Sequence, residues 1–258
     1  MEAQTIMQMN DILIQTTNKG SISLIADLNS SIRAPLFMLL LCFSLWSCST
    51  DQAPKKSTVA SSEASATQDQ PTTNSNKKTI LFFGDSLTAG YGLDEEQSFP
   101  SLIEDKIDSL ELDYHVVNAG LSGETTSGGL KRIDWVMRQP ADIFFLELGA
   151  NDMLRGLPIE ETRNNLSEII TKVQAKTPQV KIGLCEMMAA PNMGADYVRD
   201  FNKLFHDLAK EHQITLVPFY LDGVAGHPEL LLPDGKHPNA DGQMIAAKNI
   251  WKTLESML

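Results

Sequence analysis

The sequence is poor in positive charge and in cysteine. Its 21 lysine and arginine residues stand against 33 aspartate and glutamate residues, which gives a formal net charge of -12. Nucleic-acid sites need clustered lysine and arginine, so this composition argues against a nucleic-acid partner. The three cysteines, Cys42, Cys48 and Cys185, are too few and too badly spaced for a disulfide framework or a cysteine-based zinc site.

Three of the histidines also lack the partners that a metal site would need. His115, His206 and His212 fall in expected helices or strands, without an acidic or cysteine partner at ligand spacing. Cys185 lies in an apolar, strand-like run, which is typical of a buried and inert thiol. The chain has no internal repeat, and its 258 residues at 42% hydrophobic content suffice for one sizeable domain with some length left over.

The surplus length lies at the N-terminus. Residues 36–48 follow Arg33 and include eleven apolar side chains, which fits the core of a signal peptide and is short for a helix that spans a bilayer. The run ends in Leu45-Trp46-Ser47-Cys48, which resembles a bacterial lipobox, the signal that makes its cysteine the acylated first residue of a lipoprotein. The segment before Arg33 is longer than a normal signal n-region, as a start codon assigned too early would produce. Plain secretion and a buried core segment are the alternatives.

Residues 49–78 contain almost no large apolar side chain. Such a stretch cannot bury enough surface to offset its chain entropy, so we expect a flexible linker. The predicted organisation is a signal-peptide-like segment at 1–47, a flexible tether at 48–77 and a folded domain at 78–258. An acylated Cys48 would place a monomeric domain at a membrane face of the bacterial cell envelope, periplasmic or external. Without the lipid, the protein would be periplasmic or secreted and soluble.

Beyond the tether, strand-like and helix-like segments alternate. The expected strands are residues 79–83, 114–117, 142–148, 181–187 and 215–217, and the expected helices are residues 99–110, 126–137, 159–175, 196–212 and 240–258. This alternation predicts a parallel sheet with helices on both faces. Ligands of such sheets bind outside the carboxyl ends of the strands.

Small and polar residues follow the expected strands at that edge. Gly84-Asp85-Ser86 follows the first strand, where Gly84 allows a sharp turn that presents Ser86 to the crevice. Loop 118–125 contains Gly123, and the turn at 149–152 contains Asn151. Taken singly, these patterns are more typical of ordinary turns. The methionine-rich loop 187–194 suits either an adaptable apolar acyl pocket or ordinary packing.

Asp234 and His237 lie just before the last expected helix. An aspartate three residues before a histidine, across Gly235, can curl back so that its carboxylate accepts the ring Nδ1 hydrogen and leaves Nε2 free as a base. Ser86 is a poor nucleophile until a base removes its proton, and His237 meets that need. Together these residues indicate acyl transfer.

The negative oxygen formed in acyl transfer needs hydrogen-bond donors. The backbone amides of Ser86 and Gly123 and the side-chain amide of Asn151 would supply three. Asp85 and Asp152 lie beside these positions, and we expect each to hydrogen-bond to its own loop.

Four blocks of the sequence resemble those of the SGNH, or GDSL, hydrolases. They are Gly84-Asp85-Ser86-Leu87, the loop with Gly123, Gly149-Ala150-Asn151-Asp152, and Asp234 with His237, in the family's order over residues 77–258. Longer stretches, such as Gly-Asp-Ser-Leu-Thr-Ala-Gly-Tyr-Gly, resemble the bacterial thioesterase, lysophospholipase and arylesterase branch. The resemblance implies a flavodoxin-like three-layer α/β/α sandwich with a central, mostly parallel five-stranded sheet, and neither metal nor cofactor.

The resemblance also implies an activity and its residues. It assigns Ser86, Asp234 and His237 to catalysis and Ser86, Gly123 and Asn151 to the oxyanion hole of a serine esterase that works through a seryl acyl-enzyme. The expected substrates are lysophospholipids, aryl esters or acyl thioesters. A carbohydrate O-deacetylase on the same fold is the nearest alternative, and a non-catalytic ligand-binding lipoprotein is another. An α/β-hydrolase is disfavoured because no Gly-x-Ser-x-Gly elbow surrounds Ser86.

Overall fold

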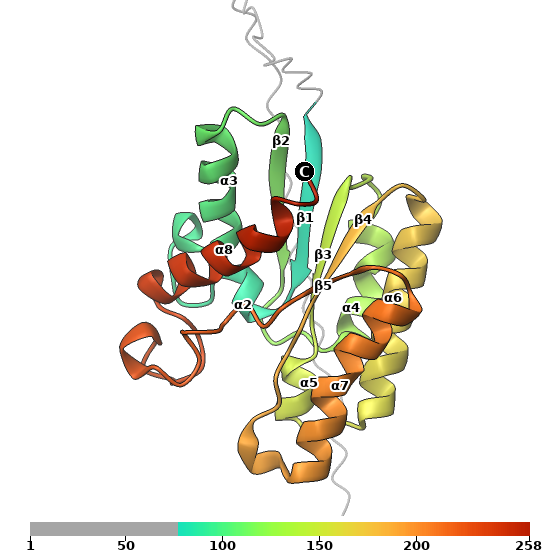
Figure 1. Ribbon diagram of the computed structural model, residues 1–258, viewed down its shortest axis with the longest axis vertical. Helices are drawn as coiled ribbons and strands as arrows, with labels where there is room; N and C mark the ends of the chain where they lie inside the picture. The colour runs from blue at the N-terminus through green and yellow to red at the C-terminus, as the bar shows by residue number, and fades with distance from the viewer. Residues whose placement is uncertain (1–76) are drawn as a thin grey trace, which may run out of the picture. The chain divides into compact units, whose positions relative to one another are not determined.

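The computed structural model describes residues 77–258, which are coloured in Figure 1. The predicted signal-peptide-like segment, Cys48 and the tether up to residue 76 lie outside the described residues. Within residues 77–258, no helix has the length and apolar character needed to cross a membrane.

Five parallel strands form the central sheet. They are β1 (Lys78–Gly84), β2 (Tyr114–Gly120), β3 (Ile143–Glu147), β4 (Lys181–Cys185) and β5 (Thr215–Val217), in the spatial order β2-β1-β3-β4-β5. All four strand pairings are parallel. The predicted α/β fold with a five-stranded parallel sheet is therefore confirmed.

Helices cover both faces of this sheet, as Figure 1 shows. The longer helices are α3 (Phe99–Ser109), α4 (Thr126–Val136), α6 (Ile159–Lys176), α7 (Ala195–Glu211) and α8 (Ala240–Leu254). Helices α3 and α8 pack together on one face, while α6 contacts both α4 and α7 on the other. Shorter elements complete the domain: α2 (Ser86–Ala89), α5 (Ala150–Leu154), and the 3-10 turns η1 (Glu95–Gln97), η2 (Pro191–Met193) and η3 (Pro228–Leu230).

Strand β1 is the core of the domain because apolar side chains leave it toward both helical layers. The Phe82 ring lies 5.3 Å from that of Phe99 on α3, edge to face. Phe83 points the other way, where Gly129 of α4 leaves room for its ring. Both phenylalanines are fully buried, and each such side chain contributes about 1.5–3 kcal/mol by leaving water. This packing fixes the end of β1, from which the Ser86 turn begins.

The strand order places a crevice at the carboxyl end of β1. The chain leaves β1 to form β2 on one side, and the later β3 pairs with the opposite side. Connections that diverge in this way open a cleft between them. The turns that follow β1 and β3 therefore meet at one sheet edge.

Several element boundaries differ from the predictions. Strand β2 continues to Gly120 because residues 118–120 keep their register with β1, so the loop predicted to start at residue 118 begins at Leu121. Asp142 lies outside β3, and its carboxylate accepts a hydrogen bond from Thr79 N at 2.8 Å. Strand β4 ends at Cys185 rather than residue 187, and α8 ends at Leu254 rather than residue 258. The short helices α2 and α5 were not predicted.

Candidate active site

The turn after β1 exposes one hydroxyl to a cavity. Ser86 is the first residue of α2, and Asp85 caps this helix by accepting a hydrogen bond from Leu87 N at 3.0 Å. The turn requires glycine at position 84, because a Cβ atom there would lie 2.1 Å from Thr88 Oγ1 and 2.4 Å from a Glu147 carboxylate oxygen. Tight packing beneath the turn thus sets the direction of the Ser86 side chain.

Ser86 is joined to His237 and Asp234, as the sequence predicts. Ser86 Oγ lies 2.8 Å from His237 Nε2, and His237 Nδ1 lies 2.5 Å from Asp234 Oδ2. The other carboxylate oxygen of Asp234 accepts hydrogen bonds from the backbone N–H groups of Lys236 and His237. The hydrogen bond with the His237 ring, followed by these backbone bonds, holds the pKa of Asp234 well below its ordinary value. Asp234 is therefore a fixed negative charge behind the imidazole.

An aromatic ring packs against that imidazole. The rings of Tyr91 and His237 have their centroids 4.5 Å apart, with an angle of 38° between their planes. Tyr91 is half exposed and also lines the cavity in front of Ser86. The contact limits the orientations open to the His237 ring. We did not predict this residue, although it lies within the Gly-Asp-Ser-Leu-Thr-Ala-Gly-Tyr-Gly stretch.

Gly123 and Asn151 reach the same cavity from two other loops. Gly123 has a φ of +79°, a conformation that favours glycine, and its carbonyl accepts a hydrogen bond from Arg155 Nη2 at 2.8 Å. Asn151 lies in the first turn of α5, directly after β3. Both residues line the cavity together with Ser86 and His237. The structure thus brings together every site residue predicted for the folded domain.

The cavity has a volume of about 450 Å³ and a mostly apolar lining. Its larger apolar side chains are Leu87, Met153, Leu154 and Met188. Leu154 and Met188 are both about half exposed. Met188 comes from the loop after β4 for which the sequence suggested either an acyl pocket or ordinary packing, and it takes part in the cavity. Its neighbour Met187 is buried in the core.

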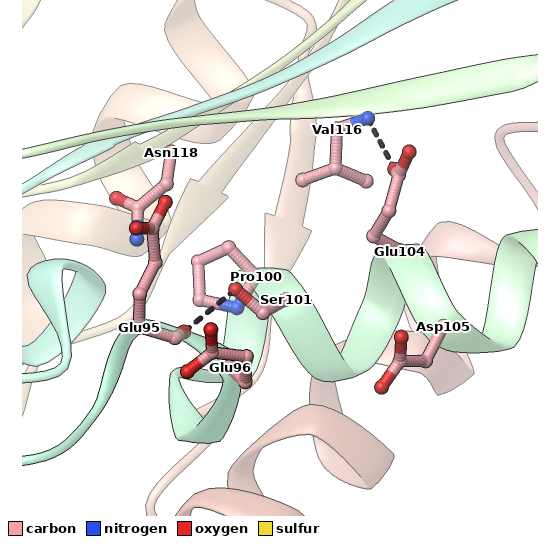
Figure 2. Close-up of a pocket in the computed structure, with 8 residues that line it drawn as sticks. All are labelled: Glu95, Glu96, Pro100, Ser101, Glu104, Asp105, Val116 and Asn118. Atoms are coloured by element: carbon pink, nitrogen blue, oxygen red, sulfur yellow. Dashed lines mark hydrogen bonds between the residues drawn. The ribbon is translucent and has the colours of Figure 1, made fainter.

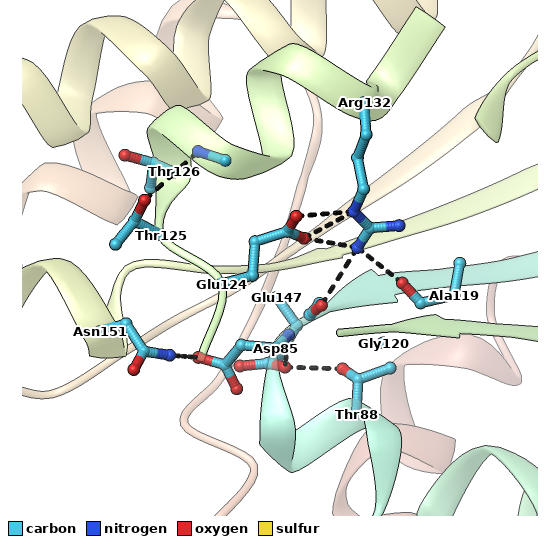
Figure 3. A network of polar contacts seen from close by, with 12 residues as sticks. Asp85, Thr88, Ala119, Gly120, Glu124, Thr125, Thr126, Arg132, Glu147 and Asn151 are labelled. Atoms are coloured by element: carbon cyan, nitrogen blue, oxygen red, sulfur yellow. Dashed lines mark hydrogen bonds and ion pairs between the residues drawn. The ribbon is translucent and has the colours of Figure 1, made fainter. Parts of the chain in front are cut away.

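Asp85 and Asn151 line the cavity and belong to a network of polar groups (Figure 3). Asp85 is 1% exposed, and its Oδ2 accepts a hydrogen bond from Asn151 Nδ2 at 2.9 Å. Burial raises the pKa of Asp85 to about 6, although its hydrogen bonds with Leu87 and Asn151 act in the opposite direction. The Asn151 carboxamide retains a second N–H for a ligand.

Arg132 of α4 connects the ends of two strands. Its Nη2 donates to the carbonyl oxygens of Ala119 and Gly84, at 2.8 and 3.4 Å. Its guanidinium also binds the buried carboxylate of Glu124, with Nε 2.7 and 2.8 Å from the two oxygens, and lies over the Phe83 ring. Because Glu124 follows Gly123, this ion pair fixes the loop of Gly123 to the end of β1. Neither charged residue was singled out from the sequence.

The prediction that Asp152 hydrogen-bonds to its own loop was wrong. Its two carboxylate oxygens accept hydrogen bonds from the backbone N–H and the hydroxyl of Thr126, at 2.9 and 2.5 Å. These contacts join α5 to the N-terminus of α4 instead of closing the turn of Asp152 itself. The prediction that Asp85 hydrogen-bonds within its own loop is confirmed by its bond with Leu87 N, and the predicted burial of Cys185 is confirmed.

A second cavity, of about 440 Å³, lies beside α3 and β2 (Figure 2). Four acidic side chains line it: Glu95, Glu96, Glu104 and Asp105. Glu104 accepts a hydrogen bond from Val116 N on the outer strand β2. Among residues 77–258 no cluster of three or more His, Cys, Asp or Glu residues is arranged to hold a metal ion.

Comparisons with known proteins agree with this geometry. The model of the GDSL-like lipase/acylhydrolase family matches residues 82–245. Esterase TesA of Pseudomonas aeruginosa is 35% identical over 70% of this chain and 90% of its own length. The arylesterase of Vibrio mimicus is 37% identical over 68% of this chain and 87% of its own length. Thioesterase 1/protease 1/lysophospholipase L1 of Escherichia coli K12 is 35% identical over 70% and 85%.

A solved structure gives the same fold. The psychrotrophic esterase EstA from Pseudoalteromonas sp., crystallised in a form inhibited by monoethylphosphonate, matches with a TM-score of 0.67 and 33% identity. The match covers 70% of this chain and 98% of that chain.

Proposed function

The chain belongs to the GDSL-like lipase/acylhydrolase family and is a serine esterase, and on this premise we propose that Ser86, His237 and Asp234 are its catalytic residues. The observation that carries the proposal is the 2.8 Å contact between Ser86 Oγ and His237 Nε2, which belong to residues 151 positions apart in the sequence. His237 is oriented from behind by Asp234, so its free nitrogen faces the hydroxyl.

The reaction follows from these contacts. His237 Nε2 takes the proton of Ser86 as Oγ attacks the ester carbonyl carbon, and the carbonyl oxygen becomes negative. When the tetrahedral intermediate collapses, the bond to the leaving alcohol breaks, and His237 returns the proton to that oxygen. Water, deprotonated by the same nitrogen, then attacks the acyl carbon. The bond from that carbon to Ser86 Oγ breaks, His237 returns the proton to Oγ, and the carboxylic acid leaves. Asp234 stays ionised and stabilises the imidazolium in both halves.

The proposed oxyanion hole consists of the backbone N–H groups of Ser86 and Gly123 and the side-chain N–H of Asn151. All three residues line the cavity in front of the hydroxyl. Asn151 is oriented by its bond to Asp85 Oδ2. Donors fixed before the substrate arrives require no reorganisation when the negative charge develops. An acyl group on Ser86 during turnover is the direct consequence, and peptide mass spectrometry after an acid quench can locate it.

The lining of the cavity supports substrates with an apolar acyl or aryl group. Met153, Leu154 and Met188 supply apolar surface, and each buried methylene contributes about 0.8 kcal/mol. We therefore place lysophospholipids, aryl esters and acyl thioesters ahead of acetylated carbohydrates. A carbohydrate O-deacetylase would gain nothing from this surface.

Replacing Leu154 and Met188 together by serine is expected to lower kcat/KM for an octanoyl ester by about 10-fold, the effect of losing roughly two methylene contacts. The rate with the acetyl ester is expected to stay near the parent value. A series of p-nitrophenyl esters from acetate to decanoate measures both. Met244→Ser is the matched control, because Met244 is equally exposed but lies on α8 outside the cavity. A parent enzyme fastest with acetate would favour the deacetylase instead.

We further propose that Cys48 carries a lipid that anchors the chain in the cell envelope, with residues 48–77 as tether and 78–258 as the hydrolase domain. The lipobox-like residues 45–48 support this, and they lie outside the described residues. Cys48→Ala is expected to move the protein from the membrane fraction to the soluble fraction with its esterase activity intact. Mass spectrometry of the mature N-terminus checks this directly, and an unmodified chain that begins at Met1 would contradict it.

A further inference from the structure

Glu147 is a buried carboxyl group that contacts the turn after β1, which carries Ser86 and is called the nucleophile turn below (Figure 3). It is the last residue of β3 and pairs in register with Gly84 of β1. Its Oε2 accepts hydrogen bonds from Thr88 Oγ1 at 2.6 Å and from Asp85 N at 3.2 Å. One oxygen therefore holds the chain on both sides of Ser86.

In the part of the chain that the structure describes, no cation pairs with this carboxyl. Glu147 is 1% exposed, and none of the ion pairs within residues 77–258 includes it. The titratable groups that act on it are Asp85 in the nucleophile turn, Cys185 at the end of β4 and Tyr220 after β5. Burial, followed by the charge of Asp85, raises the pKa of Glu147 well above its ordinary value. Two carboxyl groups in one dry site retain a proton between them.

The partners of the two carboxyls indicate which one retains the proton. Both oxygens of Asp85 accept hydrogen bonds, from Leu87 N and from Asn151 Nδ2, as a carboxylate should. Glu147 Oε1 is buried and has no partner, and in the described part of the chain the buried Tyr220 hydroxyl has none either. Within residues 77–258, an ionised Oε1 would therefore lack a hydrogen-bond donor.

We propose that Glu147 is a positioning residue that stays protonated in the active esterase. As a neutral group it can hold Asp85 N–H and the Thr88 hydroxyl at the base of the turn. The single negative charge then belongs to Asp85, where it orients the carboxamide of Asn151. The inference rests on the proposed roles of Ser86 and Asn151, and it adds to them the group that fixes both.

Two variants of Glu147 and one control variant test its protonation state and its positioning role. Glu147→Gln reproduces a protonated carboxyl, so it is expected to keep most of the parent's kcat, and its pH–rate profile should superimpose on the parent's. Glu147→Leu leaves Asp85 N–H and the Thr88 hydroxyl without an acceptor, and is expected to lower kcat by about 10²-fold with little change in KM, as a misplaced reacting group does. Glu124→Gln is the matched control. It removes the charge that pairs with Arg132, so it is expected to lower the melting temperature, whereas Glu147→Gln should not.

The protonation state can be read without catalysis. Carboxyl carbon NMR of the full chain labelled with ¹³C-glutamate, with Glu147→Gln to assign the signal, is expected to find Glu147 neutral at pH 7. An ionised signal, or a displaced acid limb in the Glu147→Gln pH profile, would overturn the proposal. Because the NMR result does not depend on which serine is the nucleophile, failure of this inference is distinguishable from failure of the catalytic assignment.

Discussion

Replacing Ser86 by alanine is expected to lower kcat for a p-nitrophenyl ester by about 10⁴- to 10⁶-fold, because no acyl-enzyme can form and only binding and the oxyanion donors remain. Ser86 Oγ donates its proton directly to His237 Nε2, and no second hydroxyl contacts that nitrogen within residues 77–258. Steady-state rates with purified protein, followed through p-nitrophenol release, provide the measurement.

The matched control for this variant is Ser122→Ala. Ser122 lines the same cavity, but it has no hydrogen bond with His237 among the described residues. We expect its kcat to remain near the parent value. Melting temperatures of both variants should match the parent, which separates lost chemistry from lost folding. A Ser86→Ala protein that hydrolyses the ester at the parent's rate would contradict the catalytic assignment.

The second large effect concerns Asn151. Asn151→Ala removes one proposed oxyanion donor and is expected to lower kcat by about 10²–10³-fold. KM should change little, because the donor acts mainly on charge that develops in the transition state. Initial rates over a range of ester concentrations separate the two constants.

Asn165→Ala serves as the control for Asn151→Ala. Its carboxamide donates to Thr126 Oγ1 at 3.1 Å, and the residue does not line the cavity of Ser86. Losing that group should affect stability more than turnover. Equal losses of kcat in the two variants, or a loss confined to KM in Asn151→Ala, would argue against a direct role for Asn151 in stabilising the oxyanion.

The positions of the proposed site residues were predictable because short-range rules determine them. Ser86 follows a buried strand, and Asp234 reaches His237 within one turn of backbone, so the local sequence indicates both arrangements. Their convergence followed from one further rule, that parallel strands bring their carboxyl ends to the same edge. The structure places Ser86 Oγ and His237 Nε2 2.8 Å apart without any adjacency in sequence.

The groups beneath the site could not be predicted in this way. Glu147 ends an apolar strand, and its partners Asp85 and Thr88 lie about 60 positions earlier in the chain. Arg132 is one of several charged residues on an amphipathic helix, and only the packed structure turns its guanidinium toward Glu124. The sequence signal for Glu147 was a charged residue at the end of an otherwise apolar strand.

The continuation of β2 was missed for a related reason. Asn118 and Gly120 are typical loop residues, yet Asn118 Nδ2 donates to Thr88 O at 3.0 Å and its Oδ1 accepts from Gly120 N at 2.9 Å. A Cβ atom on Gly120 would lie 2.3 Å from Ala89 N, so the close approach of α2 requires glycine there. The contacts of β2 with α2 determine the length of this strand, and local sequence propensity does not include such contacts.

The most direct test of the account is the location of the acyl group during turnover. The enzyme is mixed with a p-nitrophenyl ester, quenched in acid before the acyl-enzyme is hydrolysed, digested, and its peptides are analysed by mass spectrometry. We predict one acyl group per chain on Ser86, the same result in Ser122→Ala, and no acylated peptide in Ser86→Ala. An acyl group on another residue, or full hydrolysis by Ser86→Ala without any acylated peptide, would contradict it.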